Sequence, residues 1–181
     1  MIALGIKSDP IQYRHSYEWL FDLMNEAGIR HLQLGSFFEL YQLEDGYFES
    51  LRNLAEKKGI RIKSVFTAHR ELGGFFVDDP YMEKVARTSF EKLIHVAGIL
   101  GADYCGSNPG AVYRDRPADK QKGIDTYLSH MKDLSALAKE KGLKGLTMEP
   151  MSSLAEPPTT PGEMDYMIKA LNDHHQRHPD T

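Results

Sequence analysis

The sequence has little cysteine, no long apolar run and no excess of positive charge, and each absence excludes a class of protein. Cys105 is the one cysteine among the 181 residues, so no intrachain disulfide framework can form, which fits a reducing compartment. No stretch of about 18 apolar residues exists, so the sequence predicts no membrane span. The opening MIALGIKSDP lacks the basic region and apolar core of a secretory signal. We therefore expect a cytoplasmic protein.

The net charge of the chain indicates which kinds of binding partner to expect. The formal net charge is −4 and the pI is about 6.1, whereas duplex-binding proteins usually have a basic face, so nucleic acid is not expected as the main partner. An acidic protein can still have a locally positive active site, so phosphorylated metabolites remain compatible with this composition. The content of 41% hydrophobic and 27% charged residues is ordinary for a soluble globular protein.

Short apolar runs alternate with longer stretches of helical periodicity. The runs span residues 2–6, 31–34, 60–66, 102–105 and 143–148, and the predicted helices span about 13–27, 45–58, 80–100, 118–141 and 161–175. In the first helix, the residues expected on one apolar face are Trp19, Leu20, Leu23, Met24 and Ala27. Four helices end in a glycine that leads directly into the next run, in AGIRHLQL, KGIRIKSV, LGADYCGS and KGLKGLTM. This repetition predicts parallel βαβ units.

A parallel sheet can be open or closed into a barrel, and the loops distinguish the two. The first turn, KSDPIQYRHS, has no glycine, which disfavours an open nucleotide-binding sheet. A barrel places functional residues at the carboxyl ends of its strands, where this sequence has Lys7, His69, Asn108 and Glu149. We predict an α/β fold: five βα units of a partial (βα)8 TIM barrel, in one domain over residues 1–181.

Two strand ends suggest chemistry, although each also has a simpler interpretation. Glu149, in GLTMEPMSS, would lie at the barrel mouth, where it could bind a divalent cation or move a proton, or it could merely end a strand or pair with a lysine. His69, in FTAHRELGGFF, could donate a hydrogen bond, bind metal or move a proton, or be an ordinary polar loop residue.

The fourth loop, GSNPGAVYRDRPADK, combines glycines with Arg114, Arg116 and Lys120. These residues could bind a phosphate, or the loop could simply be solvated. Cys105 is expected to be a small buried residue rather than a nucleophile. The histidines of NDHHQRHPD lie on the last helix, away from the strand ends, and are given no catalytic role.

The segments GIKSD, HLQLG, HRELGGFF, CGSNPG and TMEPMS resemble the xylose-isomerase-like TIM-barrel family, and most closely its sugar-phosphate isomerases and epimerases of the erythrulose 1-phosphate epimerase type. The resemblance implies a divalent metal (manganese, zinc or magnesium) held by two glutamates, an aspartate and a histidine. One carboxylate would remove a proton next to a ketose carbonyl to give a cis-enediolate. Glu149 matches the first glutamate, while His69 and Asn108 match positions that line the substrate site; Lys7 and Arg114 are further candidates for binding the sugar or its phosphate.

The resemblance also implies that strands six to eight supply the other three ligands, and these strands are absent from the 181 residues. An inactive truncated fragment is therefore an alternative to the enzyme. A metal-dependent endonuclease that cuts abasic DNA is a less favoured alternative, because the charge is acidic and the loops have few histidines. Open barrel edges would have unpaired backbone groups, so we expect self-association into a homo-oligomer.

Overall fold

The computed structural model describes residues 3–68 and 74–179. Five parallel strands pair in sequential order, each with its neighbours along the chain. They are β1 (Gly5–Lys7), β2 (His31–Gly35), β3 (Arg61–Phe66), β4 (Tyr104–Ser107) and β5 (Gly145–Met148). The sequential parallel order confirms the predicted α/β fold with alternating strands and helices.

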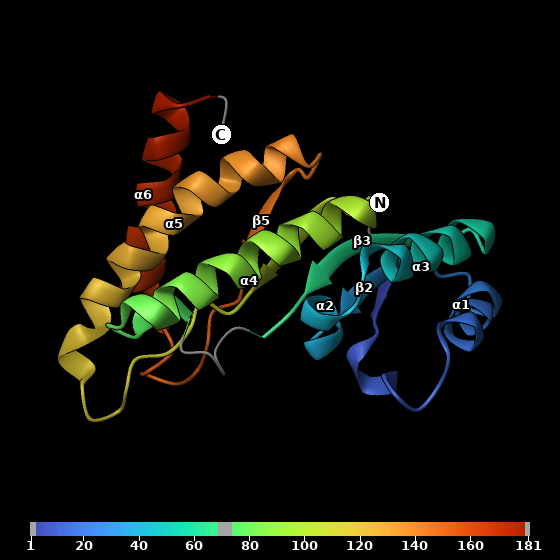
Figure 1. The fold of residues 1–181 in the computed structure, drawn as a ribbon, viewed down its shortest axis with the longest axis horizontal. Coiled ribbons are helices and arrows are strands. Elements are labelled where there is room, and N and C mark those ends of the chain that lie inside the picture. Colours follow the sequence, from blue (N-terminus) through green and yellow to red (C-terminus); the bar gives the residue numbers. More distant parts are fainter. Residues whose placement is uncertain (1–2, 69–73, 180–181) are drawn as a thin grey trace.

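Helices connect the strands (Figure 1). They are α1 (Tyr17–Glu26), α2 (Phe38–Gln42), α3 (Asp45–Lys57), α4 (Pro80–Ile99), α5 (Lys120–Glu140) and α6 (Pro161–Arg177). The described loops include the 3₁₀ turns η1 (Asp9–Ile11), η3 (Gly74–Phe76) and η4 (Pro117–Asp119). In Figure 1, α4 and α5 run side by side across the middle of the molecule, α6 stands beside α5, and α1 and α3 lie at the opposite end. None of the described helices is long and apolar enough to cross a membrane.

The two faces of the sheet differ in polarity. Leu32 and Leu34 of β2 are buried in the core together with the helices, whereas Gln33, between them, is exposed on the other face. Strand pairing extends this alternation, because Gln33 is level with Lys7 on one side and Ser64 on the other. We call the face with these polar residues the inner face, since in a barrel it would surround the axis.

Local signals set most helix boundaries. Ser16 caps α1 by accepting a hydrogen bond from the Trp19 amide at 3.2 Å. The predicted start near residue 13 was therefore too early, and Tyr13 instead has a positive φ of 63°. At the other end of α1, Gly28 has a φ of 71°, which a glycine adopts without steric cost.

The predicted apolar face of the first helix was partly wrong. Leu20 and Met24 are buried, but Trp19 and Leu23 are 43% and 42% exposed. Phe21, which the prediction left out, is fully buried. The face that packs on the sheet is thus rotated toward Phe21.

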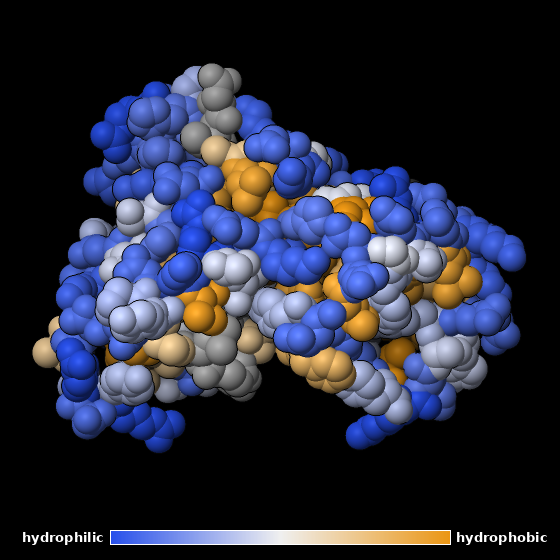
Figure 2. All heavy atoms as spheres, in the orientation of Figure 1, coloured by the Kyte–Doolittle hydropathy of each residue, from blue (hydrophilic) through white to orange (hydrophobic). Residues whose placement is uncertain are grey.

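Hydrophilic residues dominate the surface in Figure 2, and hydrophobic residues reach it in separate places, one of them where α5 and β5 lie in Figure 1. The described part of α6 begins as predicted, with Thr160 accepting a hydrogen bond from the Glu163 amide at 3.2 Å. The Glu163 carboxylate accepts a hydrogen bond from the Thr159 amide at 2.7 Å, instead of from the Thr160 amide as in a standard capping box.

Candidate functional site at the carboxyl ends of the strands

The sheet hydrogen bonding continues beyond the carboxyl ends of the strands. The Ser8 amide donates to the Gln33 carbonyl at 3.0 Å, and the Ser36 amide donates to the Phe66 carbonyl at 2.9 Å. At the other side of the sheet, the Glu149 amide donates to the Ser107 carbonyl at 3.2 Å. The first residues after the strands are therefore fixed by the sheet, so this rim can hold functional side chains in defined positions.

Glu149 lies at the carboxyl end of β5, as predicted. Gly106 pairs with Thr147 on the inner face, and two residues further along, the alternation places Asn108 and Glu149 next to each other on that face. Glu149 is exposed and its carboxylate makes no ion pair within the described ranges, whereas Asn108 is only 3% exposed. The Glu149 carboxylate can accept a proton, and the buried side-chain amide of Asn108 beside it can bind a hydroxyl group.

Lys7 ends the opposite outer strand, β1. Its ammonium group pairs with the Asp9 carboxylate at 2.8 Å and lies 4.7 Å from the centre of the Phe66 ring. Gly35 makes room for this arrangement, because a Cβ at Gly35 would lie 1.9 Å from Asp9 Oδ1. Lys7 is thus held at the rim by a carboxylate and an aromatic face. In the strand order it is separated from Glu149 by three strands, so the structure does not bring these two residues together.

The three predicted cations of the fourth loop have different environments. Arg116 pairs with Asp119 at 2.6 Å and lies 3.9 Å from Asp78. Lys120 pairs with Glu163 at 2.5 Å. Arg114 is exposed and forms no ion pair or hydrogen bond with any part of the chain that the structure describes. It lines a pocket of about 220 Å³ between the loops that follow β4 and β5.

His69 lies outside the described residues, but the described part of the same loop, from Gly74 onward, packs against the core. Phe75 of η3 is buried and stacks on His130 at 4.4 Å and on Phe90 at 5.9 Å between ring centres. His130 in turn contacts the Glu83 carboxylate at 2.7 Å. The two phenylalanines of HRELGGFF therefore pack into the core.

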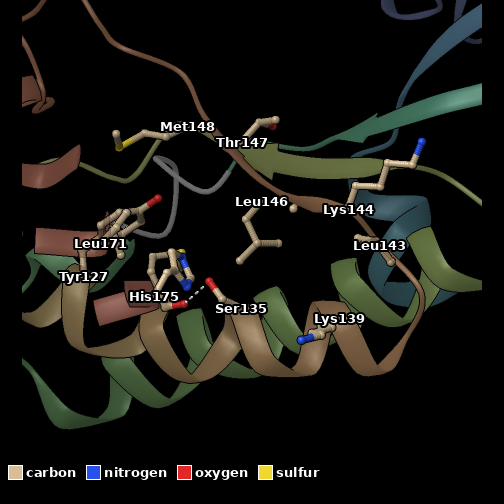
Figure 3. Close-up of a pocket in the computed structure, with 12 residues that line it drawn as sticks. Tyr127, Ser135, Lys139, Leu143, Lys144, Leu146, Thr147, Met148, Leu171 and His175 are labelled. Atoms are coloured by element: carbon tan, nitrogen blue, oxygen red, sulfur yellow. Dashed lines mark hydrogen bonds between the residues drawn. The ribbon is translucent and has the colours of Figure 1, made fainter. Parts of the chain in front are cut away.

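A pocket of about 490 Å³ lies along β5, between that strand, α5 and α6. Figure 3 shows Leu146 pointing from β5 into this space, with Leu171 and His175 of α6 on one side of it. The residues with polar side chains that line it are Tyr127, Ser135, Lys139, Lys144, Thr147 and His175, and there is no carboxylate. Because Thr147 of the inner face also lines it, the pocket is not confined to one face of β5, and it offers no carboxylate as a general base.

Cys105 is buried on β4, and burial raises the pKa of its thiol to about 12. A thiol with such a pKa is almost entirely protonated at neutral pH, and the thiolate is the reactive form. The structure therefore agrees with the prediction that Cys105 is a packing residue.

The rim at the carboxyl ends of parallel strands is the place where this kind of barrel has its active site. Residues 21–181 match the family model described as "Xylose isomerase-like TIM barrel". The chain belongs to this family. A comparison with curated proteins found no match.

Solved structures agree with the family in fold. A protein of Rhodospirillum rubrum ATCC 11170, provisionally described as a xylose isomerase, has a TM-score of 0.85 at 16% identity, over 96% of this chain and 62% of its own. The D-psicose 3-epimerase of Clostridium cellulolyticum H10, solved with D-tagatose, has a TM-score of 0.78 at 16% identity, over 94% of this chain and 60% of its own. A D-psicose 3-epimerase solved in the presence of D-fructose has a TM-score of 0.76 at 13% identity, over 99% of this chain and 67% of its own. This chain thus spans about 60% of the length of the first two, and the shared part is a partial TIM barrel.

The metal that the family resemblance implies can be tested against the residues at the rim. Within residues 3–68 and 74–179, no group of three or more histidine, cysteine, aspartate and glutamate side chains could hold a metal ion. Glu149 is one of the four ligands that the resemblance implies, and the described residues do not complete the set. Glu149 alone does not fit a divalent metal site, because such ions require several oxygen or nitrogen ligands.

Some residues of the rim were not predicted from the sequence. Asp9 follows β1 and pairs with Lys7, and Thr147 shares the inner face with Glu149. Strand alternation could have identified Thr147, because it lies two residues before Glu149. Asp9 lies in η1, a turn that the periodicity of the sequence did not reveal.

Proposed function

We propose that this chain functions in the isomerisation or epimerisation of a short ketose or ketose phosphate, by proton transfer through a cis-enediolate. The observation that supports this proposal best is the position of Glu149 at the carboxyl end of β5, on the inner face and fixed through its amide to Ser107. Family membership supports the reaction class, since the solved structures similar in fold include 3-epimerases of D-psicose and L-ribulose.

In the proposed reaction, the Glu149 carboxylate accepts the proton from the carbon next to the ketose carbonyl. The electron pair of that C–H bond forms the C=C bond of the enediolate, and the carbonyl oxygen takes the negative charge. Return of a proton to the same carbon from a second acid on the opposite side gives the epimer. Return of the proton to the neighbouring carbon, with a shift of the hydroxyl proton to the former carbonyl oxygen, gives the isomer. A carboxylate within hydrogen-bond reach of the carbon-bound proton is the requirement for this step.

We assign substrate binding to Lys7, His69, Asn108 and Arg114. The Asn108 amide can bind a sugar hydroxyl beside Glu149, and the Lys7 ammonium, fixed by Asp9, can bind an oxygen with partial negative charge. A divalent metal, manganese, zinc or magnesium, is the cofactor that the family resemblance implies; Glu149 would be one of its ligands, and the described residues do not supply the rest of the set.

The proposal is tested by hydrogen exchange in deuterated water. The purified chain, with manganese added, is incubated with a ketose phosphate and with the free ketose, and loss of the C3 proton signal is followed by NMR. Glu149→Gln is expected to abolish exchange, since an amide cannot accept the proton. Glu140→Gln, on the exposed surface of α5, is the matched control and should exchange at the wild-type rate.

Exchange that persists in Glu149→Gln would refute the assignment of the base. Absence of exchange in the wild-type chain, together with absence of tight manganese binding by calorimetry, would favour the alternative that this chain alone is inactive. The acidic charge remains the argument against the abasic-site endonuclease, and cleavage of abasic DNA by the purified chain would overturn it.

A further inference from the structure

We infer that the pocket beside Arg114 binds the phosphate group of a phosphorylated substrate, so that the chain acts on sugar phosphates rather than on free sugars. This inference rests on the proposed function for the identity of the sugar, but the pocket and its charge are independent of Glu149.

The pocket lies at the same end of the sheet as Glu149. Its walls come from the loop after β4, which includes Arg114, and from the loop after β5, which includes Ala155. The two loops are joined at the pocket, because the Val112 amide donates to the Ala155 carbonyl at 2.8 Å. The same two loops begin at Asn108 and Glu149. A ligand in the pocket would therefore contact the loop that starts at the proposed base, Glu149.

The charge of the pocket comes from one guanidinium group. Lys120, the other cation of the lining, is neutralised by Glu163 at 2.5 Å and also reaches Thr159 Oγ1 at 3.4 Å. These contacts hold the pKa of the Glu163 carboxyl below its usual range, although burial alone would raise it, so the pair is ionised at neutral pH. Arg114 lacks such a partner in the described chain, which leaves a net positive charge in a pocket of about 220 Å³.

The form of the site suits a phosphate ester. A guanidinium group binds phosphate oxygens through two parallel N–H donors, and this bond is stronger than that between neutral groups. Val112, Leu154 and Ala155 give the pocket apolar walls, against which the carbon chain of an ester can pack. Inorganic phosphate would use Arg114 alone, so the ester is expected to bind more tightly.

The test measures binding without catalysis. Dihydroxyacetone phosphate, dihydroxyacetone and inorganic phosphate are each titrated into the full chain, with ³¹P NMR for the two phosphates and calorimetry for all three. Three variants are compared, Arg114→Gln, Arg116→Gln and Glu149→Gln, and thermal melts check that each is folded. Arg116 is the matched control, because it is two residues away, has the same charge and already pairs with two aspartates.

We expect the ester to bind the wild type more tightly than inorganic phosphate and much more tightly than dihydroxyacetone. Arg114→Gln should weaken ester binding about tenfold or more, while Arg116→Gln changes it less than about twofold. Equal weakening by both arginine variants would overturn the inference, since it would indicate only a general charge effect. Binding of inorganic phosphate as tight as that of the ester would also overturn it, in favour of a free anion.

Two further outcomes separate this inference from the proposed function. Ester binding that survives in Glu149→Gln, while proton exchange is lost, supports both. Proton exchange that is unaffected by Arg114→Gln, on a ketose phosphate, refutes the phosphate pocket and leaves the reaction standing.

Discussion

Substitution of Gly106 by alanine should destabilise the chain strongly, because β4 and β5 approach closely at this glycine. A Cβ at position 106 would lie 1.9 Å from the Thr147 carbonyl oxygen and 2.2 Å from Thr147 Oγ1. Ordinary van der Waals contact begins at about 3.4 Å, so β5 would have to move by more than 1 Å. A change of rotamer can remove the hydroxyl from the contact, but it cannot move the backbone carbonyl.

The expected cost has two parts. Overpacking of this kind costs about 1–3 kcal/mol, and each hydrogen bond lost between the separated strands costs about 1 kcal/mol more. We therefore expect Gly106→Ala to lower the free energy of unfolding by about 3 kcal/mol. Gly46→Ala is the control, since a Cβ there meets nothing within 4 Å and alanine is the better helix former by up to about 1 kcal/mol.

Urea unfolding followed by far-UV circular dichroism measures both variants. Adding Thr147→Ala to Gly106→Ala should restore little stability, because the carbonyl contact at 1.9 Å remains. If the free energy of unfolding of Gly106→Ala is within about 0.5 kcal/mol of the wild-type value, the inferred close approach of β4 and β5 is wrong. Recovery of full stability in the double variant would instead show that the steric clash at position 106 involves only the Thr147 hydroxyl.

The remaining predictions concern a core ring, a buried carboxylate and the sheet edges. Phe75→Ala removes a ring that packs on His130 and Phe90, and should lower the free energy of unfolding by about 3–5 kcal/mol in the same urea assay. Asp103 is 5% exposed, and hydrogen bonds from Lys63 and Lys144 hold its pKa below the ordinary 3.8. The ionised Asp103 therefore contributes fully to stability above pH 3.8, and this contribution is lost as the pH falls through the pKa of Asp103 in the folded state. Asp103→Asn should make the free energy of unfolding in urea depend less on pH in the acid range. An unchanged pH dependence would contradict this. The unpaired edges of the described sheet should cause self-association, and a clean monomer by light scattering with a sharp thermal transition would argue against it.

The order of strands and helices was predictable because its signals are local. Alternation of apolar runs with helical periodicity, and glycines such as Gly28 and Gly59 at helix ends, depend on a few neighbouring residues. The rim position of Glu149 followed from the same pattern, since it is the first residue after β5. The rotation of α1 was not predictable, because Trp19 and Phe21 both have large aromatic side chains and only the position of the sheet decides which of them is buried.

The electrostatics of the fourth loop could not be predicted for a related reason. The sequence shows Arg114, Arg116 and Lys120 as equivalent cations. In the structure, Arg116 is close to Asp78, and Lys120 reaches Glu163, both far away along the chain. Tertiary contacts therefore pair two of the three cations and leave Arg114 without an ion pair in the described part of the chain.

The polarity of the inner face explains how a sheet of five parallel strands can remain folded with one face open. The interior of a closed TIM barrel is usually filled with branched apolar side chains, which would be costly to leave in water. Here the inner face has Lys7, Gln33 and Ser64 on three adjacent strands, and Gln33 donates to Ser64 at 3.2 Å. Most apolar side chains lie on the helix side, in the core, while the aromatic rings of Phe66 and Tyr104 lie on the inner face. Water over the polar part of the inner face therefore costs little, and these two rings, together with the unpaired N–H and C=O groups of β1 and β5, are left to drive association. It follows that charged substitutions at these outer strands should reduce self-association, whereas substitutions of the polar residues in the middle of the inner face should not.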